Sequence, residues 1–395
     1  MNWPLYIQLS LMMFLQFAVW GAWSPVLAAR LLGPLKFSGK QTGWIYGTVF
    51  IGCIISPLIA GQIADRWIAT QWFLSGAHLV GGVLLLIAAR RKKFWPLLAV
   101  MGLYGLAFAP TLALVNSLMF RHLGATGVSP FAVFVWGVIG WVLVGWALAF
   151  WRRVKGSGEG GDCLILAALL SLVMGVYCLL LPHTPAPGAE QPFTEALSLL
   201  KDPNFLIFLV VGFVLATQLQ FYFLGTAQYL GDLGVQSRNM PAVMTIAQGA
   251  QVAAMAFMAF YETELLAGMG FRRILTIGAM MWLAMYGAYA AGKPRLLVIA
   301  SQALHGLAYT FFINVGFVYV NKVAPAGISK IANSAQGLYT VVIFGFGLFL
   351  GTQFTGVVMD RFKTPEGKFR WRAIYLVPCV LTAACVIAIA ALFRG

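Results

Sequence analysis

Long apolar runs, separated by short breaks that contain polar residues, glycine or proline, recur along the whole chain. Each run is about 20 residues long, which is the length that an α-helix needs to cross the hydrocarbon core of a bilayer. The strands of a membrane barrel would instead show segments of about ten residues with alternating polarity. The runs therefore predict membrane-spanning helices, near residues 4–29, 42–64, 70–89, 95–118, 131–151, 163–182, 204–229, 239–261, 271–291, 295–320, 334–358 and 372–393.

The composition supports an integral membrane protein. Only 9% of the 395 residues are charged and 61% are hydrophobic, whereas a soluble domain carries roughly 25% charged residues. The net charge of +15 comes from lysines and arginines in short clusters between the apolar runs. Such clusters indicate contact with lipid headgroups, and they leave no basic domain that could bind nucleic acid. The five cysteines show no C-x-x-C spacing, so they predict neither a disulfide framework nor a metal site.

A proline-rich polar connection divides the chain into two halves with six predicted helices each. We therefore expect an N-terminal six-helix bundle at 1–182, a central cytoplasmic linker at 183–203 with a short surface helix at 194–201, and a C-terminal six-helix bundle at 204–395. This all-α layout of twelve transmembrane helices is typical of the major facilitator fold, whose halves consist of inverted three-helix repeats. The pattern G-x-x-x-D-R, which ends the second helix at Arg66 and the eleventh at Arg361, is consistent with such repeats.

The polar residues inside the predicted helices are uncharged. All eleven Asp and Glu residues fall in connections or at helix ends, and a carboxylate at the bilayer midplane is normally kept only for ion or proton handling. The interior polar groups are Gln218 and Gln220 on the seventh helix, Gln248 and Gln251 on the eighth, and Gln302, His305 and Tyr309 on the tenth.

Several of these polar groups share a helical face with one another or with aromatic rings, because positions three, four or seven apart lie on the same side of a helix. A single glutamine in a membrane more often bonds a neighbouring helix. A whole set is costly to bury unless it faces a water-filled cavity. Amides both donate and accept hydrogen bonds, and aromatic rings stack on flat rings. We therefore expect a small, polar, uncharged solute that is cyclic or aromatic.

Five short segments resemble, in the same order, the nucleoside:proton symporter family, the bacterial nucleoside permeases of the major facilitator superfamily. These segments are residues 14–23 (FLQFAVWGAW), 110–117 (PTLALVNS), 181–185 (LPHTP), 304–312 (LHGLAYTFF) and 334–338 (SAQGL). The resemblance implies a multi-pass protein of the bacterial inner membrane with both termini in the cytoplasm. It also implies a substrate site at Phe134, Val138, Trp141, Gln220, Phe223, Gln248, Gln251, His305, Tyr309 and Thr310.

The chain departs from the family pattern at four of these positions. The permeases typically carry arginine at Phe134, threonine at Val138, glutamate at Gln251 and aspartate at Thr310. Since neither Gln251 nor Thr310 can titrate, the sequence predicts either a facilitator, which we favour, or proton coupling through His305, the interior histidine on the face of the proposed site. Orientation rests on the resemblance, because 18 of the 26 lysines and arginines fall in connections that it places outside, against the positive-inside rule.

Three functions stay open at this point: transport of nucleosides or similar neutral solutes by alternating access, transport of another neutral solute such as a sugar, and a scaffold or sensor that transports nothing. The chain contains neither H-E-x-x-H nor G-x-S-x-G, and it places no carboxylate pair inside a predicted helix, so we do not expect an enzyme. The expected partners are a nucleoside-like small molecule, the lipid bilayer and, in the coupled alternative, protons. No cofactor, metal or nucleic acid is expected.

Overall fold

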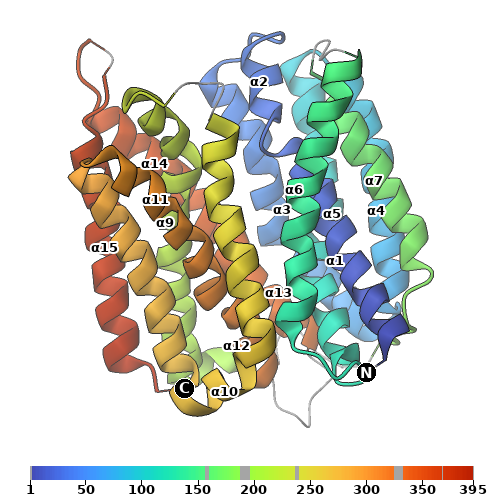
Figure 1. Ribbon diagram of the computed structural model, residues 1–395. Coiled ribbons are helices and arrows are strands. Elements are labelled where there is room, and N and C mark those ends of the chain that lie inside the picture. Colours follow the sequence, from blue (N-terminus) through green and yellow to red (C-terminus); the bar gives the residue numbers. More distant parts are fainter. Residues whose placement is uncertain are drawn as a thin grey trace. The chain divides into compact units, whose positions relative to one another are not determined.

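Helices form nearly all of the ordered structure in the computed structural model, which describes residues 2–155, 160–186, 196–235, 240–323, 332–366 and 368–394 (Figure 1). Within these residues the sole strand-like pairing is a bridge between Lys363 and Phe369. The chain divides into two compact units. Unit 1 comprises Met1–Leu197 and Asn321–Val341, and unit 2 comprises Ser198–Val320 and Val342–Gly395. The prediction of an all-α protein is confirmed.

Unit 1 contains the first six predicted spans and the beginning of the eleventh. Its helices are α1 (Trp3–Trp23), α2 (Leu27–Leu32), α3 (Gly39–Arg66), α4 (Thr70–Arg90), α5 (Phe94–Leu123), α6 (Pro130–Lys155), α7 (Asp162–Cys178) and α13 (Ala332–Thr340). Helix α13 belongs to this unit because it packs against α3 and α5.

Among the helix boundaries in unit 1 that differ from the prediction, two have a clear local reason. The first helix was expected to reach residue 29, but α1 ends at Trp23. Pro25 lacks an N–H and cannot continue the hydrogen bonds of the helix, so the chain turns there. Helix α3 begins three residues early, at Gly39, because the side chains of Ser38 and Gln41 each bond the other's backbone N–H in a capping box.

Unit 2 contains the remaining spans. Its helical segments are η1 (Leu199–Lys201), α9 (Pro203–Asp232), α10 (Met240–Ala291), α11 (Arg295–Ala308), η3 (Tyr309–Asn314), most of α12 (Val315–Val323), η5 (Val341–Gly347), α14 (Leu348–Arg361) and α15 (Trp371–Leu392). Segments η3 and η5 are π-helical. The predicted surface helix is seen at its end as η1, whereas Thr194 and the central part of the linker, residues 187–195, lie outside the described residues.

Helix α10 is two helices joined at a sharp turn. Gly270 has φ 68° and ψ 169°, which is not helical, and a positive φ is a conformation that glycine adopts readily. The turn separates the predicted spans 239–261 and 271–291. Among the described residues, nine helical stretches are long and apolar enough to cross a membrane, and the stretch Val243–Ala291 contains this turn. Helices α3 and α7 occupy the two predicted runs that are not among the nine.

Glycines let helices of unit 1 approach each other closely. A Cβ atom at Gly140 of α6 would collide with the Phe14 carbonyl oxygen of α1, and one at Gly137 would lie 2.7 Å from the Phe17 ring. In a bilayer, lipid tails are as apolar as helix surfaces, so close backbone packing rather than hydrophobic burial holds helices together. The α1–α6 pair shows this type of packing.

Candidate functional site

The ten predicted site residues lie in both units. Three of them, Phe134, Val138 and Trp141, lie on α6 of unit 1. The other seven lie in unit 2, on α9, on the first half of α10, on α11 and on η3. The two groups are described separately below.

In unit 2, His305 of α11 is surrounded by aromatic rings. The ring of Tyr222 stacks on the imidazole, with centroids 3.8 Å apart and planes 12° from parallel. Phe223 presents its edge at 5.6 Å, Tyr309 lies at 6.3 Å and Trp282 at 6.2 Å. Only 5% of His305 is exposed. The structure thus brings together four rings from α9, the second half of α10 and η3 around one histidine.

A hydrogen bond from Trp282 assigns the protonation of this histidine. The indole Nε1 of Trp282 lies 3.3 Å from Nδ1 of His305, and an indole N–H can only donate. Nδ1 is therefore the acceptor, and the proton of the neutral ring is assigned to Nε2. A second proton on Nδ1 would place two donors against each other, and none of the acidic residues in the described part hydrogen-bonds the ring. This arrangement stabilises the neutral imidazole.

Next to His305, Gly306 allows α11 to touch the backbone of α10. A Cβ atom at Gly306 would collide with the carbonyl oxygen of Ala247 and lie 2.7 Å from the backbone nitrogen of Gln251. Gln248 and Gln251 belong to this turn of α10, and both are half-buried. No hydrogen bond within the described residues holds either side-chain amide. The two amides are therefore available to bond a solute close to His305.

The remaining polar candidates of unit 2 are more deeply buried. Thr310 is fully buried, and its hydroxyl donates to the carbonyl of Gly306 at 3.2 Å, so it bonds its own helix. Gln220 is 4% exposed on α9. Two glutamines outside the predicted set, Gln218 and Gln302, each bury an amide oxygen that has no partner among the described residues. Unpartnered buried acceptors are uncommon and indicate space for water or a ligand nearby.

The π-helical segment η3 begins four residues after His305 and carries Tyr309 and Thr310. Short π-helical segments within α-helices frequently occur at functional sites, because the extra residue in the turn changes the direction of the side chains that follow. Tyr309 is half-buried, whereas Thr310 points into the unit. The local backbone thus separates the environments of two adjacent predicted site residues.

In unit 1, Phe134 is mainly a packing residue. Its ring meets the edges of Phe120 and Phe131 at 6.1 Å and 5.9 Å, and it is buried, as is Val138. Trp141 is half-buried and lies edge-to-face against Trp20 at 5.7 Å. Of the three α6 residues, Trp141 has the most ring surface left for a solute.

Gln16 and His78, two further polar residues inside the helices of unit 1, form a chain of hydrogen bonds. His78 Nε2 donates to Gln16 Oε1 at 2.8 Å, because an amide oxygen can only accept. Gln16 Nε2 then donates to Thr111 Oγ1 at 2.7 Å, and Thr111 donates to the Phe108 carbonyl at 2.6 Å. All three polar side chains are at most 1% exposed. This satisfied network joins α1, α4 and α5 and has a structural role.

The sequence pattern does not single out Tyr222 or Trp282, although both contact His305. Tyr222 stands in the apolar stretch that follows Gln220, and Trp282 lies 23 positions before His305. A local signal exists only for Gly306, a small residue beside a buried histidine, since small residues mark close helix contacts in membranes.

Comparison with known proteins is consistent with this architecture. The family model described as "Nucleoside H+ symporter" matches residues 3–395. The nucleoside permease NupG of Escherichia coli is 26% identical, over 99% of this chain and 96% of its own length. The xanthosine permease of the same organism is 28% identical, over 94% of this chain and 91% of its own.

Solved structures agree with the family match. The crystal structure of NupG superposes with a TM-score of 0.72 at 25% identity, and the match covers 100% of both chains. XylE, a proton:xylose symporter of the major facilitator superfamily, superposes with a TM-score of 0.70 at 13% identity, which supports the fold alone. The relatives are permeases, so the protein is a membrane transporter and not an enzyme. The predicted all-α major facilitator fold is confirmed. The chain belongs to the nucleoside H+ symporter family.

Proposed function

We propose that the protein transports nucleosides across the bacterial inner membrane by alternating access, and that His305, Tyr309, Gln248 and Gln251 of unit 2 bind the nucleoside. The observation that carries this proposal is the contact of Gly306 with the backbone of α10, which holds two half-buried, unbonded amides beside a histidine enclosed by aromatic rings. The family match and the similarity to the nucleoside permease NupG and the xanthosine permease support it.

The chemistry of these residues suits a nucleoside. A base offers a flat ring, and Tyr309, which is half-buried, offers an aromatic face; such stacking contributes roughly 1–3 kcal/mol. The Nε2–H of His305 can donate to a ring nitrogen or a carbonyl oxygen. The amides of Gln248 and Gln251 can pair with ribose hydroxyls, which also both donate and accept. None of these groups carries a charge, so the proposed solute is neutral.

We include the rest of the predicted set in the proposal with different roles. Trp141 of α6 would act as a stacking surface of unit 1, because its ring is half-buried. Phe134, Val138 and Thr310 are buried by neighbours of their own unit, so their effect on binding would be through shape. Gln220 and Phe223 flank Tyr222 on α9, and Phe223 lies edge-on to His305. These two residues would support the position of the histidine.

Uptake of radiolabelled uridine and adenosine by transporter-deficient bacteria tests the proposed function. Cells that express the protein should accumulate label, and Gln251→Ala should reduce the apparent affinity threefold to tenfold, the effect of losing one neutral hydrogen bond of about 0.5–1.5 kcal/mol. Gln228→Ala is a matched control, because Gln228 is an exposed glutamine of α9. Absence of uptake by correctly inserted protein would reject the nucleoside proposal.

We further propose that transport is facilitative. Related permeases typically carry acidic residues at two positions where this chain has Gln251 and Thr310, which do not titrate. The hydrogen bond from Trp282 stabilises the neutral form of His305. Proteoliposomes with an imposed inward proton gradient distinguish the two modes. Uridine should only equilibrate. Accumulation above the outside concentration that a protonophore abolishes would overturn this proposal, and its loss in His305→Gln would then assign the coupling to the histidine.

A second candidate substrate is another neutral solute, such as a sugar. It is favoured by the uncharged residues at Phe134, Val138, Gln251 and Thr310, where nucleoside permeases typically carry arginine, threonine, glutamate and aspartate. A thermal-shift screen of the purified protein against nucleosides, nucleobases and sugars separates the candidates. Stabilisation by sugars alone would favour this candidate over nucleosides.

A further inference from the structure

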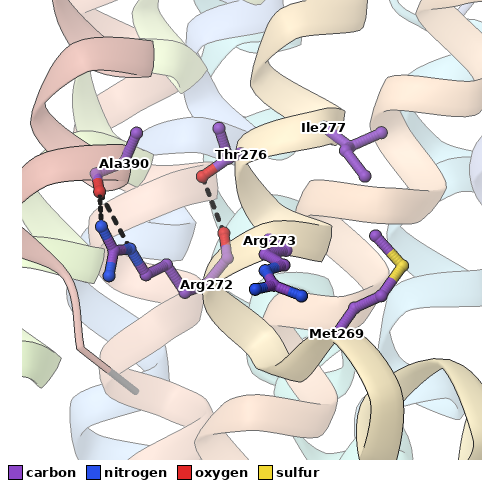
Figure 2. A pocket seen from close by; sticks show the side chains of 6 residues that line it. All are labelled: Met269, Arg272, Arg273, Thr276, Ile277 and Ala390. Atoms are coloured by element: carbon purple, nitrogen blue, oxygen red, sulfur yellow. Dashed lines mark hydrogen bonds between the residues drawn. The ribbon is translucent and has the colours of Figure 1, made fainter.

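A basic cavity lies at one end of unit 2, where the turn of α10 meets the C-terminal end of α15 (Figure 2). Its volume of about 450 Å³ falls in the range of roughly 300–1,000 Å³ that is typical of small-ligand sites. The lining residues are Met269, Arg272, Arg273, Thr276, Ile277 and Ala390. The cavity is distinct from the proposed substrate site, because Trp282, the residue of this helix that bonds His305, lies about ten residues or 15 Å further along α10.

Two arginines give the cavity a positive charge that no lining residue neutralises. Arg272 is held in place, since its Nε donates to the Ala390 carbonyl at 2.9 Å and its Nη2 donates to the same oxygen. This leaves the N–H groups of Nη1 free to bind a ligand. Arg273 also lines the cavity and forms no ion pair or hydrogen bond with any described residue. The cavity therefore offers two guanidinium groups, and none of the residues that line it is acidic.

Apart from the two arginines and Thr276, the side chains that line the cavity are apolar. Met269 and Ile277 form one side, and the α15 end that contains Ala390 forms another. The cavity lies at the ends of two helices that are both long and apolar enough to cross a membrane. It is thus placed where hydrocarbon gives way to headgroups, and it combines an anion-binding part with an apolar part. A water-soluble anion would use the arginines but would gain little from Met269 and Ile277.

We infer that this cavity binds the phosphate of an anionic phospholipid, with Arg273 as the main phosphate ligand and Arg272 as a pre-oriented second donor. Guanidinium groups recognise phosphate through paired, charge-assisted hydrogen bonds. Basic pockets between membrane helices bind anionic lipid headgroups for the same reason. The bound lipid would also stabilise the α10 turn at Gly270, because the two arginines lie two and three residues after it.

Lipid titration of the purified full-length protein, followed by native mass spectrometry and thermal shift, tests this inference. Short-chain phosphatidylglycerol should bind and stabilise the protein, whereas phosphatidylcholine, which is zwitterionic, and inorganic phosphate should bind far more weakly. Removal of one charge in Arg273→Gln should weaken phosphatidylglycerol binding about fivefold, and removal of both in Arg272→Gln/Arg273→Gln should weaken it about 30-fold. If the double variant folds poorly because the Arg272 hydrogen bonds to the Ala390 carbonyl are lost, the single variant Arg273→Gln still tests the site.

The matched control is Arg370→Gln/Arg372→Gln, which removes the same charge at the opposite end of α15. This variant should bind phosphatidylglycerol as the unmodified protein does. An equal loss in the control would overturn the site, because it would show a general effect of surface charge. Equal binding of phosphatidylcholine would refute the charge selectivity, and equal competition by inorganic phosphate would identify a free-anion site instead of a lipid site.

Discussion

Substitution of Gly306 by alanine should lower both the free energy of unfolding and the affinity for nucleoside. The added Cβ would collide with the Ala247 carbonyl oxygen and lie 2.7 Å from the Gln251 backbone nitrogen. Ordinary van der Waals contact begins near 3.4 Å, so the Gln251 nitrogen alone would require α11 and α10 to separate by about 0.7 Å, and the nearer Ala247 oxygen requires more. Both obstructing atoms belong to helix backbone and cannot rotate away as a side chain can.

The expected loss of stability follows from this geometry. Overpacking of a tight contact usually costs about 1–3 kcal/mol. Alanine favours a helix over glycine by about 1 kcal/mol, but this gain offsets little here, because membrane helices stay largely hydrogen-bonded within themselves when tertiary contacts are lost. We therefore expect the free energy of unfolding to fall by about 1–3 kcal/mol. Separation of the helices would also move the Gln251 amide away from His305, so nucleoside affinity should fall about threefold to tenfold.

Denaturant unfolding in micelles and equilibrium binding of uridine measure the two effects. Gly287→Ala is the matched control, since Gly287 also lies within a helix of unit 2, α10, but an added Cβ there would meet no atom within 4 Å. The control should retain full stability and affinity. If Gly306→Ala were as stable as the control, the close contact of α11 with α10 would be wrong. If it were less stable but bound uridine normally, the contact would be structural only.

Three further substitutions test other parts of the structure. Gln248→Ala should lower uridine affinity threefold to tenfold in equilibrium binding without changing unfolding; a loss of stability of the same size would assign the amide to helix packing. Trp141→Ala should weaken uridine binding more than binding of a saturated sugar, because stacking needs a π-face, and equal losses in a thermal-shift titration would contradict the stacking role. Gln16→Leu should destabilise unit 1 by roughly 1–3 kcal/mol, since it leaves His78 Nε2 without a buried partner. A loss below about 0.5 kcal/mol in denaturant unfolding would show that the network is dispensable.

The helices themselves were predictable because few backbone conformations are stable in the hydrocarbon core of a bilayer. A segment of about 20 apolar residues must satisfy its own hydrogen bonds in lipid, and a helix does so locally. The capping box at Ser38 and Gln41 and the break at Pro25 are also local signals, and both explain where the observed helices differ from a purely apolar count. The uncharged character of the helix interiors was equally evident, because the positions of the acidic residues can be seen along the chain.

Which polar residue meets which partner was decided by tertiary structure. Gln16 and His305 each stand within an apolar run of the sequence. In the structure Gln16 bonds His78, 62 positions away, whereas His305 is enclosed by Tyr222 and Trp282. Periodicity reports the face of a helix on which a residue lies. It carries no information on the rotation and height at which the next helix packs, and those depend on close contacts such as that of Gly306 with the backbone of α10. Sequence therefore determined the helices and their polar faces, and helix packing decided which of these faces are satisfied internally and which keep free hydrogen-bonding groups for a solute.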